Sequence, residues 1–440
     1  MRLLLLTHYY APEFGAPQRR WSALVRRFVA AGHRVTVAAP VPHYPGGHPT
    51  PAQRRIHRVG AVETGQHGET VLRTAFLPHR ADIGTRTADH AVAAADALRR
   101  LRRRFCRPGT RPDVIIATAP AIPTLLLGRT LSALWDVPMV VEMRDAWPDL
   151  VTHVGPAGAI TPGAAARMHR SALRRALSWG VALAKGEVHE QVTRWQSGAR
   201  AVVTTTGRFA EVLRERGVGS VHVVRNGTDL SLVPRQRDHL PGDHPELRCL
   251  YLGNMGRSQG LDTVVRAAAA LRREGVDVRV RMVGHGVEAA ELAALAYELD
   301  APVEVIPRIP HREVGAQYAW ADTVIVSLRD WAPFAWTVPS KLYEMLATGR
   351  HITALLAGEA ADVVREAEAG DVLPPEDVDA LVELWRGMAE ERSRAAVRAS
   401  GRAWVAEHAD DDVLAGRYLE ILHRVLQDRR LEAAPRTSLR

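Results

Sequence analysis

Lys341 and Glu344 are the two residues whose types and spacing most directly indicate chemistry. Side chains three residues apart on a helix share one face. A nucleotide sugar needs such a pair, because a cation binds its diphosphate and a carboxylate accepts both ribose hydroxyls. The alternative is an ordinary surface ion pair. Lysine is rare here, since only Lys185 and Lys341 are lysines among 58 Lys and Arg residues, and a phosphate site that requires a compact ammonium explains the exception.

The elements around this pair predict a strand–helix–strand unit. Residues 337–349 form a short helix with a start signal at Pro339 and a stop at Gly349. Apolar runs rich in β-branched residues, at 322–328 and 352–356, predict a strand on either side. The helix therefore begins at the carboxyl end of a parallel strand, where α/β sheets bind ligands and helix N–H groups favour an anion.

The segment Pro339-Ser340-Lys341-Leu342-Tyr343-Glu344-Met345-Leu346-Ala347-Thr348-Gly349 resembles the signature of the retaining glycosyltransferases of family 4. The resemblance covers nearly the whole chain and is greatest to members that transfer N-acetylated amino sugars in bacterial surface-polysaccharide assembly. It implies the α/β architecture called GT-B, in which two Rossmann-like domains face each other across a cleft. It also implies that Lys341 acts on the leaving diphosphate, while Ser340, Leu342 and Glu344 bind the donor.

A glycine-bearing segment, residues 253–260, follows a predicted strand and resembles the family's G-R-L-x-x-x-K-G loop with two departures. Asn254 stands at the family's Arg and Gln259 at its Lys, so Lys341, with Arg257 as a helper, is left to neutralise the diphosphate. Trp336 stands where many members carry a glutamate, and it either stacks on the sugar or acts as a lid. The resemblance adds to the donor-binding residues Gly253, Asn254, Arg257, Gln259, Arg308, Ile309 and, from the amino-terminal half, Gly15.

The amino-terminal half supplies the expected acceptor side. A long loop at 8–20 holds Gly15 and Arg19 and resembles the family's glycine-containing loop. The segment Arg144-Asp145-Ala146-Trp147-Pro148 resembles the R-D-x-W-P segment of the amino-sugar subgroup. By this resemblance Arg144 and Asp145 act in catalysis, Asp145 orients or deprotonates the acceptor, and Arg19 and Trp147 bind it. The alternatives are a plain surface loop and charge pairs between neighbouring loops.

Alternating strand and helix patterns recur in two halves of the chain without a sequence repeat. We expect an acceptor-side domain at 1–230 and a nucleotide-sugar domain at 247–412, joined by an aperiodic linker. An apolar helix at 413–428 is expected to return to the first domain. Residues 429–440 are expected to form a disordered tail.

Composition limits the class of protein. With 46% hydrophobic and 24% charged residues the chain is globular, and two cysteines are too few for a disulfide framework. No run reaches the length of a membrane span and no signal pattern is visible, so we expect a cytoplasmic protein. The histidines include no H-E-x-x-H and no tight Cys/His cluster, which predicts no metal site.

The net charge of +9 is uneven, because residues 1–200 carry 28 basic and 13 acidic side chains, an excess of +15. A helix at 89–105 combines an apolar stripe with five arginines in six positions. It either lies on anionic lipid, as a peripheral protein at the inner face of the cell membrane would, or packs on the core with a solvated back. Aromatic residues are only 5%, which argues against nucleic acid as a partner.

These observations together predict a metal-independent glycosyltransferase without a cofactor. We expect it to move a hexose, in particular an N-acetylated hexosamine, from a nucleoside diphosphate sugar to a hydroxyl group, with a UDP-sugar as the expected donor. The expected acceptor is lipid-linked or a small molecule, in the biosynthesis of a cell-surface glycan or a glycosylated metabolite. The alternatives are a nucleotide-sugar epimerase of the same architecture and a basic nucleic-acid-binding protein without enzymatic activity.

Overall fold

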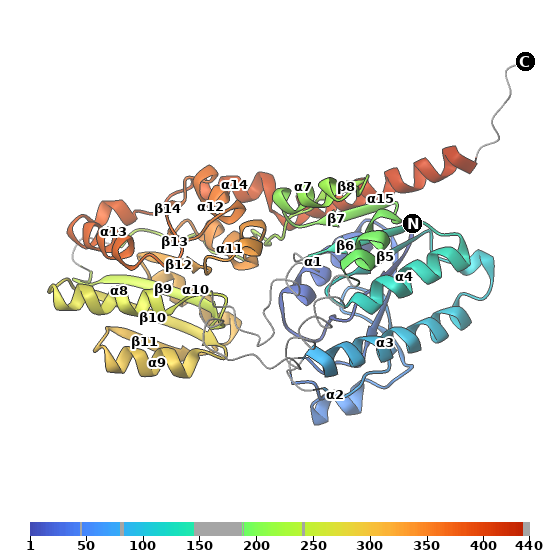
Figure 1. The fold of residues 1–440 in the computed structure, drawn as a ribbon, viewed down its shortest axis with the longest axis horizontal. Helices are drawn as coiled ribbons and strands as arrows, with labels where there is room; N and C mark the ends of the chain where they lie inside the picture. The colour runs from blue at the N-terminus through green and yellow to red at the C-terminus, as the bar shows by residue number, and fades with distance from the viewer. Residues whose placement is uncertain (45, 80–82, 145–186, 188, 240–242, 434–440) are drawn as a thin grey trace, which may run out of the picture. The chain divides into compact units, whose positions relative to one another are not determined.

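Two largely parallel sheets organise the chain, each within its own unit (Figure 1). The computed structural model describes residues 1–433 except 45, 80–82, 145–186, 188 and 240–242. Unit 1 holds the described residues of 1–225 together with 411–433, and unit 2 holds those of 226–410. The two places where the chain changes unit lie close together, since the Thr228 N–H donates to the carbonyl of Ala409 at 3.0 Å.

The sheet of unit 1, within the described residues, has the order β3-β4-β2-β1-β5-β6-β7-β8, and only β3 is antiparallel to its neighbour. Its central strands are nearly continuous apolar runs because helices cover a parallel sheet on both faces. The strands are β1 (Arg2–Leu6), β2 (Arg34–Pro40), β3 (Val62–Thr64), β4 (Thr70–Thr74), β5 (Val114–Thr118), β6 (Met139–Met143), β7 (Ala201–Thr204) and β8 (Val221–Val223).

Helices from both ends of the chain pack on this sheet. The first and the last form one core with β1 and β2, in which the rings of Trp21 and Tyr418 meet edge to face with centroids 5.9 Å apart. The helices of unit 1 are α1 (Ala16–Ala30), α2 (Pro51–Ile56), α3 (Ile83–Arg104), α4 (Ile122–Trp135), α7 (Gly207–Glu215) and α15 (Asp411–Ala433), with a further helical stretch at 189–197 and a 3₁₀ turn at Pro108–Thr110.

The sheet of unit 2 is parallel throughout its described strands, in the order β11-β10-β9-β12-β13-β14. Successive residues of β12 enter opposite cores: Val324 and Val326 belong to one and Ile325 to the other. The strands are β9 (Leu247–Asn254), β10 (Val278–His285), β11 (Val303–Pro307), β12 (Thr323–Ser327), β13 (His351–Leu355) and β14 (Gly370–Leu373).

Each face of this sheet has its own helices. Helices α8 (Asp262–Arg273), α9 (Ala289–Glu298) and α13 (Val378–Glu390) supply the core that contains Ile325. Helices α10 (His311–Trp320), α11 (Ser340–Thr348), α12 (Glu359–Glu366) and α14 (Ser400–His408) supply the other core. The 3₁₀ turns of unit 2 are at Ala332–Trp336 and Arg392–Ala395. Lys341 and Glu344 therefore lie on a helix that packs on the face of the sheet to which Val324 and Val326 point.

Two boundaries differ from those expected from the sequence. The chain enters unit 2 at Asn226, before the expected linker, because Arg402 donates to the carbonyls of Leu230 and Val233 and holds this stretch on unit 2. The expected tail is wrong for 429–433, which continue α15. Arg429 bonds to Asp136 in this last part of the helix, and residues 434–440 lie outside the described part.

Candidate active site

Helix α11 carries the cation and carboxylate predicted from the sequence. It ends at Gly349, whose φ of +83° is the left-handed conformation that glycine adopts without strain. Pro339 precedes it and has no side-chain acceptor with which to cap the first turn. An uncapped helix start presents N–H groups and a partial positive charge to an anion. Lys341 is half-buried in this first turn, so a cation and the helix start occupy one place.

The carboxylate of Glu344 is buried and oriented by a phenol. Glu344 is 8% exposed, and its Oε1 accepts a hydrogen bond of 3.0 Å from the hydroxyl of Tyr318. Tyr318 lies on α10, is 1% exposed and belongs to the same core as α11. A buried carboxylate requires hydrogen-bond donors. The hydrogen bond from Tyr318 therefore helps to hold the orientation of this carboxylate.

The turn after β9, residues 255–260, is shaped by an amide. The Oε1 atom of Gln259 accepts the Gly256 N–H at 3.0 Å within the turn, and Ser327 at the end of β12 donates to the Gln259 carbonyl at 2.6 Å. Gln259 stands where the family has a lysine, so this position shapes the turn instead of adding a cation. Asn254 at the end of β9 is exposed, with the Tyr251 hydroxyl donating to its carbonyl at 2.6 Å.

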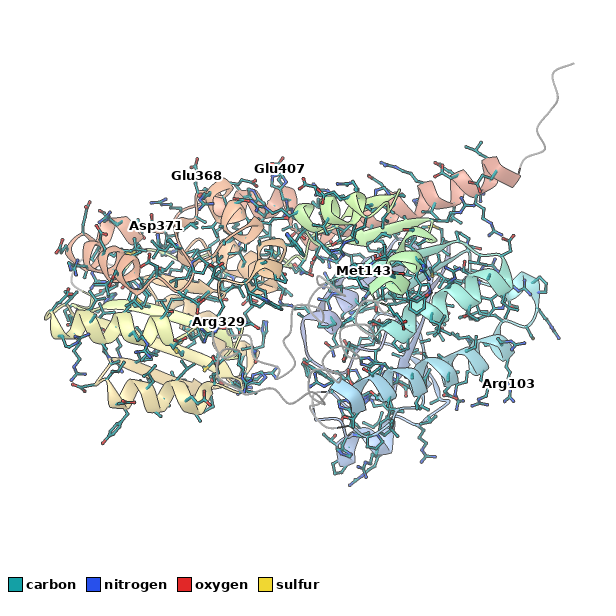
Figure 2. All side chains as sticks on the ribbon, viewed as in Figure 1. Arg103, Met143, Arg329, Glu368, Asp371 and Glu407 are labelled. Carbon is teal, nitrogen blue, oxygen red and sulfur yellow. The ribbon has the colours of Figure 1, made fainter. Side chains whose placement is uncertain are left out.

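Arg329, which follows β12, holds the same turn in place through hydrogen bonds. Its N–H donates to the carbonyl of Ser258 at 2.9 Å, and its Nε donates to the carbonyl of Arg257 at 2.7 Å. Figure 2 labels this residue on unit 2. No role was expected for Arg329, although it lies two residues beyond a buried strand, at the carboxyl end of the sheet, where ligands of parallel sheets bind.

Carboxylates already balance the charge of Arg329. Glu376 lies 2.6 Å and Asp262 3.1 Å from its guanidinium. Burial alone would lower the pKa of Arg329, but Asp262, Glu376 and Glu288 outweigh burial and raise it. The pKa of the neighbouring Glu288 carboxyl is also raised, in this case by burial. Arg329 therefore supports the turn, and it is not a substitute for the family's two phosphate-binding cations.

The other expected donor residues of unit 2 lie at the carboxyl ends of neighbouring strands. Arg308 and Ile309 follow β11, where Arg308 is exposed and Ile309 packs against the core of α11. Trp336 is half-buried at the end of the 3₁₀ turn that precedes α11. This turn lies against Gly358, where a Cβ atom would come 2.2 Å from the carbonyl oxygen of Ala335.

On the expected acceptor side, helix α1 begins earlier than predicted. It starts at Ala16, so Arg19 is an exposed residue of its first turn, and Gly15 is its N-cap. Pro17 in this first turn is a helix-start signal that the sequence contained. Arg144 follows β6 and is 7% exposed, with its carbonyl accepting the Thr205 hydroxyl at 2.9 Å. Asp145 and Trp147 lie outside the described residues.

A buried ion pair near the carboxyl ends of the unit 1 strands was not foreseen. Arg20, expected in the loop, lies in α1, and its Nε is 3.0 Å from Oε1 of Glu142, which is fully buried. The guanidinium also donates to the carbonyl of Val224 at 2.9 Å. The hydrogen bonds that the guanidinium makes offset part of the cost of burying these two charges. It ties α1 to β6 and to the chain after β8.

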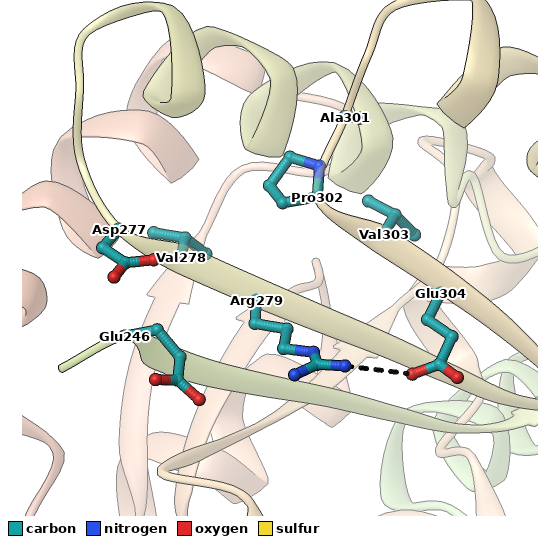
Figure 3. Close-up of a pocket in the computed structure, with 8 residues that line it drawn as sticks. All are labelled: Glu246, Asp277, Val278, Arg279, Ala301, Pro302, Val303 and Glu304. Atoms are coloured by element: carbon teal, nitrogen blue, oxygen red, sulfur yellow. Dashed lines mark ion pairs between the residues drawn. The ribbon is translucent and has the colours of Figure 1, made fainter. Parts of the chain in front are cut away.

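The pocket shown in Figure 3 lies in unit 2, at the opposite end of its sheet from the expected donor-binding residues. It has a volume of about 520 Å³, and residues at the amino-terminal ends of β9, β10 and β11 line it. Arg279 and Glu304 form an ion pair of 3.9 Å at its wall. Ligands of parallel sheets bind at the carboxyl ends of the strands, so we do not place the active site there.

Known proteins that are similar to this chain in sequence are glycosyltransferases. Residues 246–390 match the family model described as "Glycosyl transferases group 1". The chain is similar to a putative colanic acid biosynthesis glycosyl transferase of Escherichia coli, with 25% identity over 87% of this chain and 90% of that protein. It is also 28% identical to a GDP-mannose-dependent phosphatidylinositol monomannoside mannosyltransferase of Mycolicibacterium smegmatis, over 41% of this chain and 48% of that protein.

Solved structures share the fold over almost the full length. Sucrose-phosphate synthase of Thermosynechococcus elongatus has a TM-score of 0.70 at 16% identity and covers 97% of this chain and 99% of its own. Anabaena HepE in complex with UDP and glucose has a TM-score of 0.62 at 16% identity and covers 96% of this chain and 99% of its own. The two-unit α/β architecture expected from the sequence is confirmed.

Proposed function

The chain is a glycosyltransferase of the GT-B fold, and we propose that it transfers a sugar from a nucleoside diphosphate to a hydroxyl group with retention of the anomeric configuration. One observation carries the proposal: Glu344, buried and oriented by Tyr318, lies one helical turn after Lys341 within the matched segment. A carboxylate and a cation at a helix start suit a ribose and a diphosphate.

In the mechanism we propose, the protein supplies charge and orientation and no nucleophile. Lys341 and the first N–H groups of α11 stabilise the diphosphate as it leaves, and Glu344 accepts the ribose hydroxyls. The acceptor hydroxyl attacks from the face that the diphosphate vacates, which retains the configuration. Asp145 orients the acceptor or takes its proton, and Arg144 assists it. This chemistry requires no metal ion and no cofactor.

The remaining contacts follow from position and resemblance. We propose that the turn after β9 approaches the diphosphate through its backbone, with Arg257 as the cation, because Gln259 is used to shape the turn. The other proposed contacts with the donor come from Gly15, Ser340, Leu342, Gly253, Asn254, Arg308 and Ile309. Arg19 and Trp147 are the proposed contacts with the acceptor.

For the donor we propose a UDP-sugar, in particular a UDP-N-acetylhexosamine. The nucleotide is supported by the structural neighbour that binds UDP and glucose, and the amino sugar by the resemblance of the 144–148 segment to that subgroup. The Escherichia coli relative, named for colanic acid biosynthesis, supports a role in a surface polysaccharide with a lipid-linked acceptor. A glycosylated small molecule is the other product class that we propose to test.

We further propose that unit 1 docks on an anionic membrane through α3. Asp96 pairs with Arg99 at 2.8 Å and with Arg100 at 2.6 Å, so one carboxylate neutralises part of the charge of these two arginines. The last turn adds three more arginines that are exposed, Arg102, Arg103 and Arg104. Among the described residues, no helix is both long and apolar enough to cross a membrane, so the proposed attachment is at the surface.

The proposal is tested by incubating the purified chain with a panel of UDP-, GDP- and TDP-sugars, with lipid-linked and soluble acceptors in separate reactions. The expected result is a glycosylated acceptor whose anomeric configuration, read by NMR, matches the donor. The Lys341→Ala variant is the control for contaminating activity. Formation of an epimeric nucleotide sugar without acceptor would identify an epimerase, and no turnover of any donor would contradict the proposal.

A further inference from the structure

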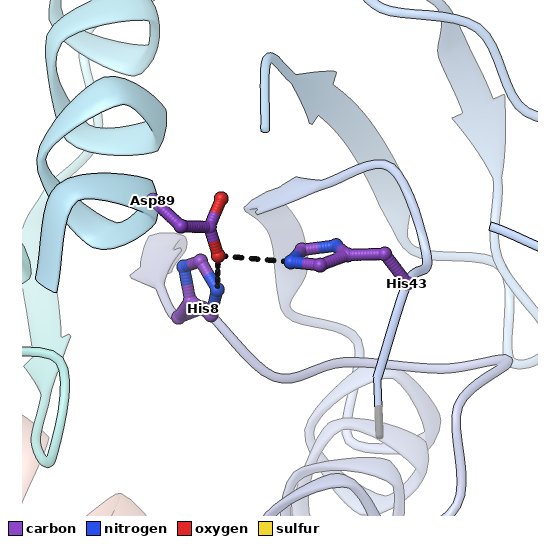
Figure 4. A group of neighbouring side chains, drawn as sticks. All are labelled: His8, His43 and Asp89. Carbon is purple, nitrogen blue, oxygen red and sulfur yellow. Dashed lines mark hydrogen bonds and ion pairs between the residues drawn. The ribbon is translucent and has the colours of Figure 1, made fainter. Parts of the chain in front are cut away.

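Two histidines and an aspartate from three separate segments meet at the carboxyl end of the unit 1 sheet (Figure 4). His8 follows β1, His43 follows β2, and Asp89 lies in the first half of α3. The Nε2 atoms of both histidines lie 2.9 Å from the same oxygen, Oδ2 of Asp89. All three side chains are buried, and the three ligand atoms lie within 4.8 Å of one another.

Hydrogen bonds around the cluster direct acceptor atoms toward this common point. The Nδ1 atom of His43 lies 2.7 Å from the carbonyl oxygen of Val41, so this nitrogen carries hydrogen and donates, which leaves the lone pair of a neutral ring on Nε2. Oδ1 of Asp89 accepts the Leu77 N–H at 2.7 Å. Oδ2 of Asp89 and Nε2 of His43 lie 2.9 Å apart and face the same point, so that point holds either a proton that the two atoms share or an ion that both atoms bind.

His8 shows that a proton alone does not satisfy the cluster. The residue is 4% exposed, and its buried Nε2 has no hydrogen-bond partner among the described residues, although it lies 2.9 Å from Oδ2, because the two atoms are misaligned for a hydrogen bond. A buried polar atom without a partner is costly. A proton between His43 and Asp89 leaves His8 unsatisfied, whereas a metal ion accepts a lone pair from each of the three.

We propose that His8, His43 and Asp89 bind a divalent transition-metal ion of the zinc class. Two imidazole nitrogens and a carboxylate oxygen suit zinc and its neighbours, whereas calcium and magnesium prefer oxygen ligands alone. A ligand histidine that donates from its other nitrogen to a backbone carbonyl, as His43 does to Val41, is the usual arrangement around such ions. The Nε2 atom of His79, 3.8 Å from Oδ2, is the candidate for a fourth ligand.

A second group, in unit 2, also contains a histidine nitrogen without a hydrogen-bond partner among the described residues, Nε2 of His244, but a guanidinium contacts its aspartate. His239 and His244 lie 3.6 and 3.5 Å from Oδ1 of Asp322. The other oxygen of Asp322 already accepts hydrogen bonds from Arg392 at 2.9 Å and from the Arg248 N–H at 2.8 Å. A nearby guanidinium disfavours a second cation. His244 therefore provides a matched control, a histidine beside an aspartate where no metal is expected.

The proposed ion would act on structure. It would connect three segments that are far apart in the sequence: the loop after β1, the loop after β2, and α3. The loop after β1 is the one that leads to Gly15. The spacing of the sequence did not indicate this group, because 46 residues separate His43 from Asp89, far more than the spacing within a short metal-binding motif. The inference uses residues of unit 1 alone, so it can fail while the proposed transfer activity stands.

The test uses the full chain without a histidine tag, treated with EDTA and dialysed. Zn²⁺ is titrated by calorimetry and Co²⁺ by visible absorbance, and melting is followed with and without Zn²⁺. We expect one equivalent of metal, cobalt d–d bands and a higher melting temperature with zinc. His43→Gln and Asp89→Asn should lower the affinity by about tenfold or more, and His244→Gln should leave it unchanged.

Two results would overturn the proposal. One is an absence of stoichiometric zinc binding by the unaltered chain. The other is zinc binding by His43→Gln and Asp89→Asn that equals that of the unaltered chain, which would mean that only surface histidines bind the metal. Loss of zinc in His244→Gln with retention in His43→Gln would place the site in unit 2 and also contradict it. If the two variants fail to fold, X-ray absorption of the zinc-loaded His244→Gln variant decides, because this variant lacks the second histidine of the unit 2 group. A shell with two imidazoles supports the proposal, and a shell without imidazole overturns it.

Discussion

Tyr318→Phe removes one oxygen atom and tests whether the orientation of Glu344 controls donor binding. The hydroxyl donates to Oε1 of Glu344 at 3.0 Å, and both side chains are almost fully buried, at 1% and 8% exposure. A hydrogen bond to a charged acceptor contributes about 1.5–3 kcal/mol. The carboxylate left in the variant has lost this donor and its fixed direction, so part of that energy is lost from the interaction with the ribose.

We expect UDP to bind about tenfold more weakly to Tyr318→Phe, which corresponds to about 1.4 kcal/mol, and Glu344→Gln to lose at least as much. The assay is calorimetric titration of UDP into both variants and the double variant. Because the phenol acts through the carboxylate, the effects should not add, and the double-variant cycle should give a coupling of about 1 kcal/mol. Tyr418→Phe, which removes a buried phenol from unit 1, is the control and should bind UDP normally.

Two outcomes would refute this reasoning at different steps. Unchanged UDP affinity in Glu344→Gln would remove the carboxylate from the donor site. Normal affinity in Tyr318→Phe beside weak binding in Glu344→Gln would keep the carboxylate but show that the ligand orients it without the phenol. Urea unfolding of each variant separates both results from a loss of folded protein.

Four further changes test other parts of the argument. Lys341→Ala should lower turnover at saturating donor about ten- to hundredfold with an unchanged melting temperature. Lys341→Arg should recover little of this turnover, since a planar guanidinium does not replace a compact ammonium. Near-normal turnover of Lys341→Ala would exclude Lys341 from stabilising the leaving group. Arg329→Gln should raise the donor KM more than it lowers kcat because the turn after β9 loosens, and an unchanged KM would argue against this role. Flotation with anionic liposomes should weaken with salt, because each arginine at such a surface contributes about 1 kcal/mol, and equal binding to neutral liposomes would contradict docking; the same weakening is expected on replacement by Gln of Arg99, Arg100, Arg102, Arg103 and Arg104. Burial alone would raise the pKa of Asp96, but hydrogen bonds from Arg100 and Arg99 lower it, so its contribution to stability is complete above the ordinary carboxyl pKa of about 4 and is lost as the pH falls through the lowered value; urea unfolding between pH 6 and pH 3 should show a smaller loss of stability in Asp96→Asn.

Local patterns were enough to predict the elements that carry the expected chemistry. The apolar run at 322–328, the helical spacing around Lys341 and the glycine at 349 depend on neighbours within a few residues, and β12 and α11 lie where they were predicted. Parallel strands with helices on both faces also leave continuous apolar runs that can be read directly. The α/β fold class and the place of Glu344 on α11 therefore followed from the sequence.

Helix ends were less well predicted where a signal was available but not used. Pro17 marks the start of α1, so Arg19 and Arg20 belong to a helix and not to the preceding loop. The carboxyl-terminal helix extends to Ala433, with proline following only at position 435. Polar composition near a chain end suggested a tail, whereas the ion pair of Arg200 with Glu432 holds this turn against unit 1.

Only the tertiary structure decided which side chains meet. Tyr318 reaches Glu344 across 26 residues, and Arg329 reaches the carbonyl of Arg257 across 72. His8, His43 and Asp89 come together at the carboxyl end of the unit 1 sheet, because β1 and β2 are neighbouring strands that both end there and the first half of α3 lies beside them. Propensity and periodicity act over one or two helical turns, but the partners of a buried carboxylate or imidazole are set by which elements the sheet order makes neighbours. The sequence thus determined the residues with chemical potential, and the packing of distant strands determined how they are oriented and combined.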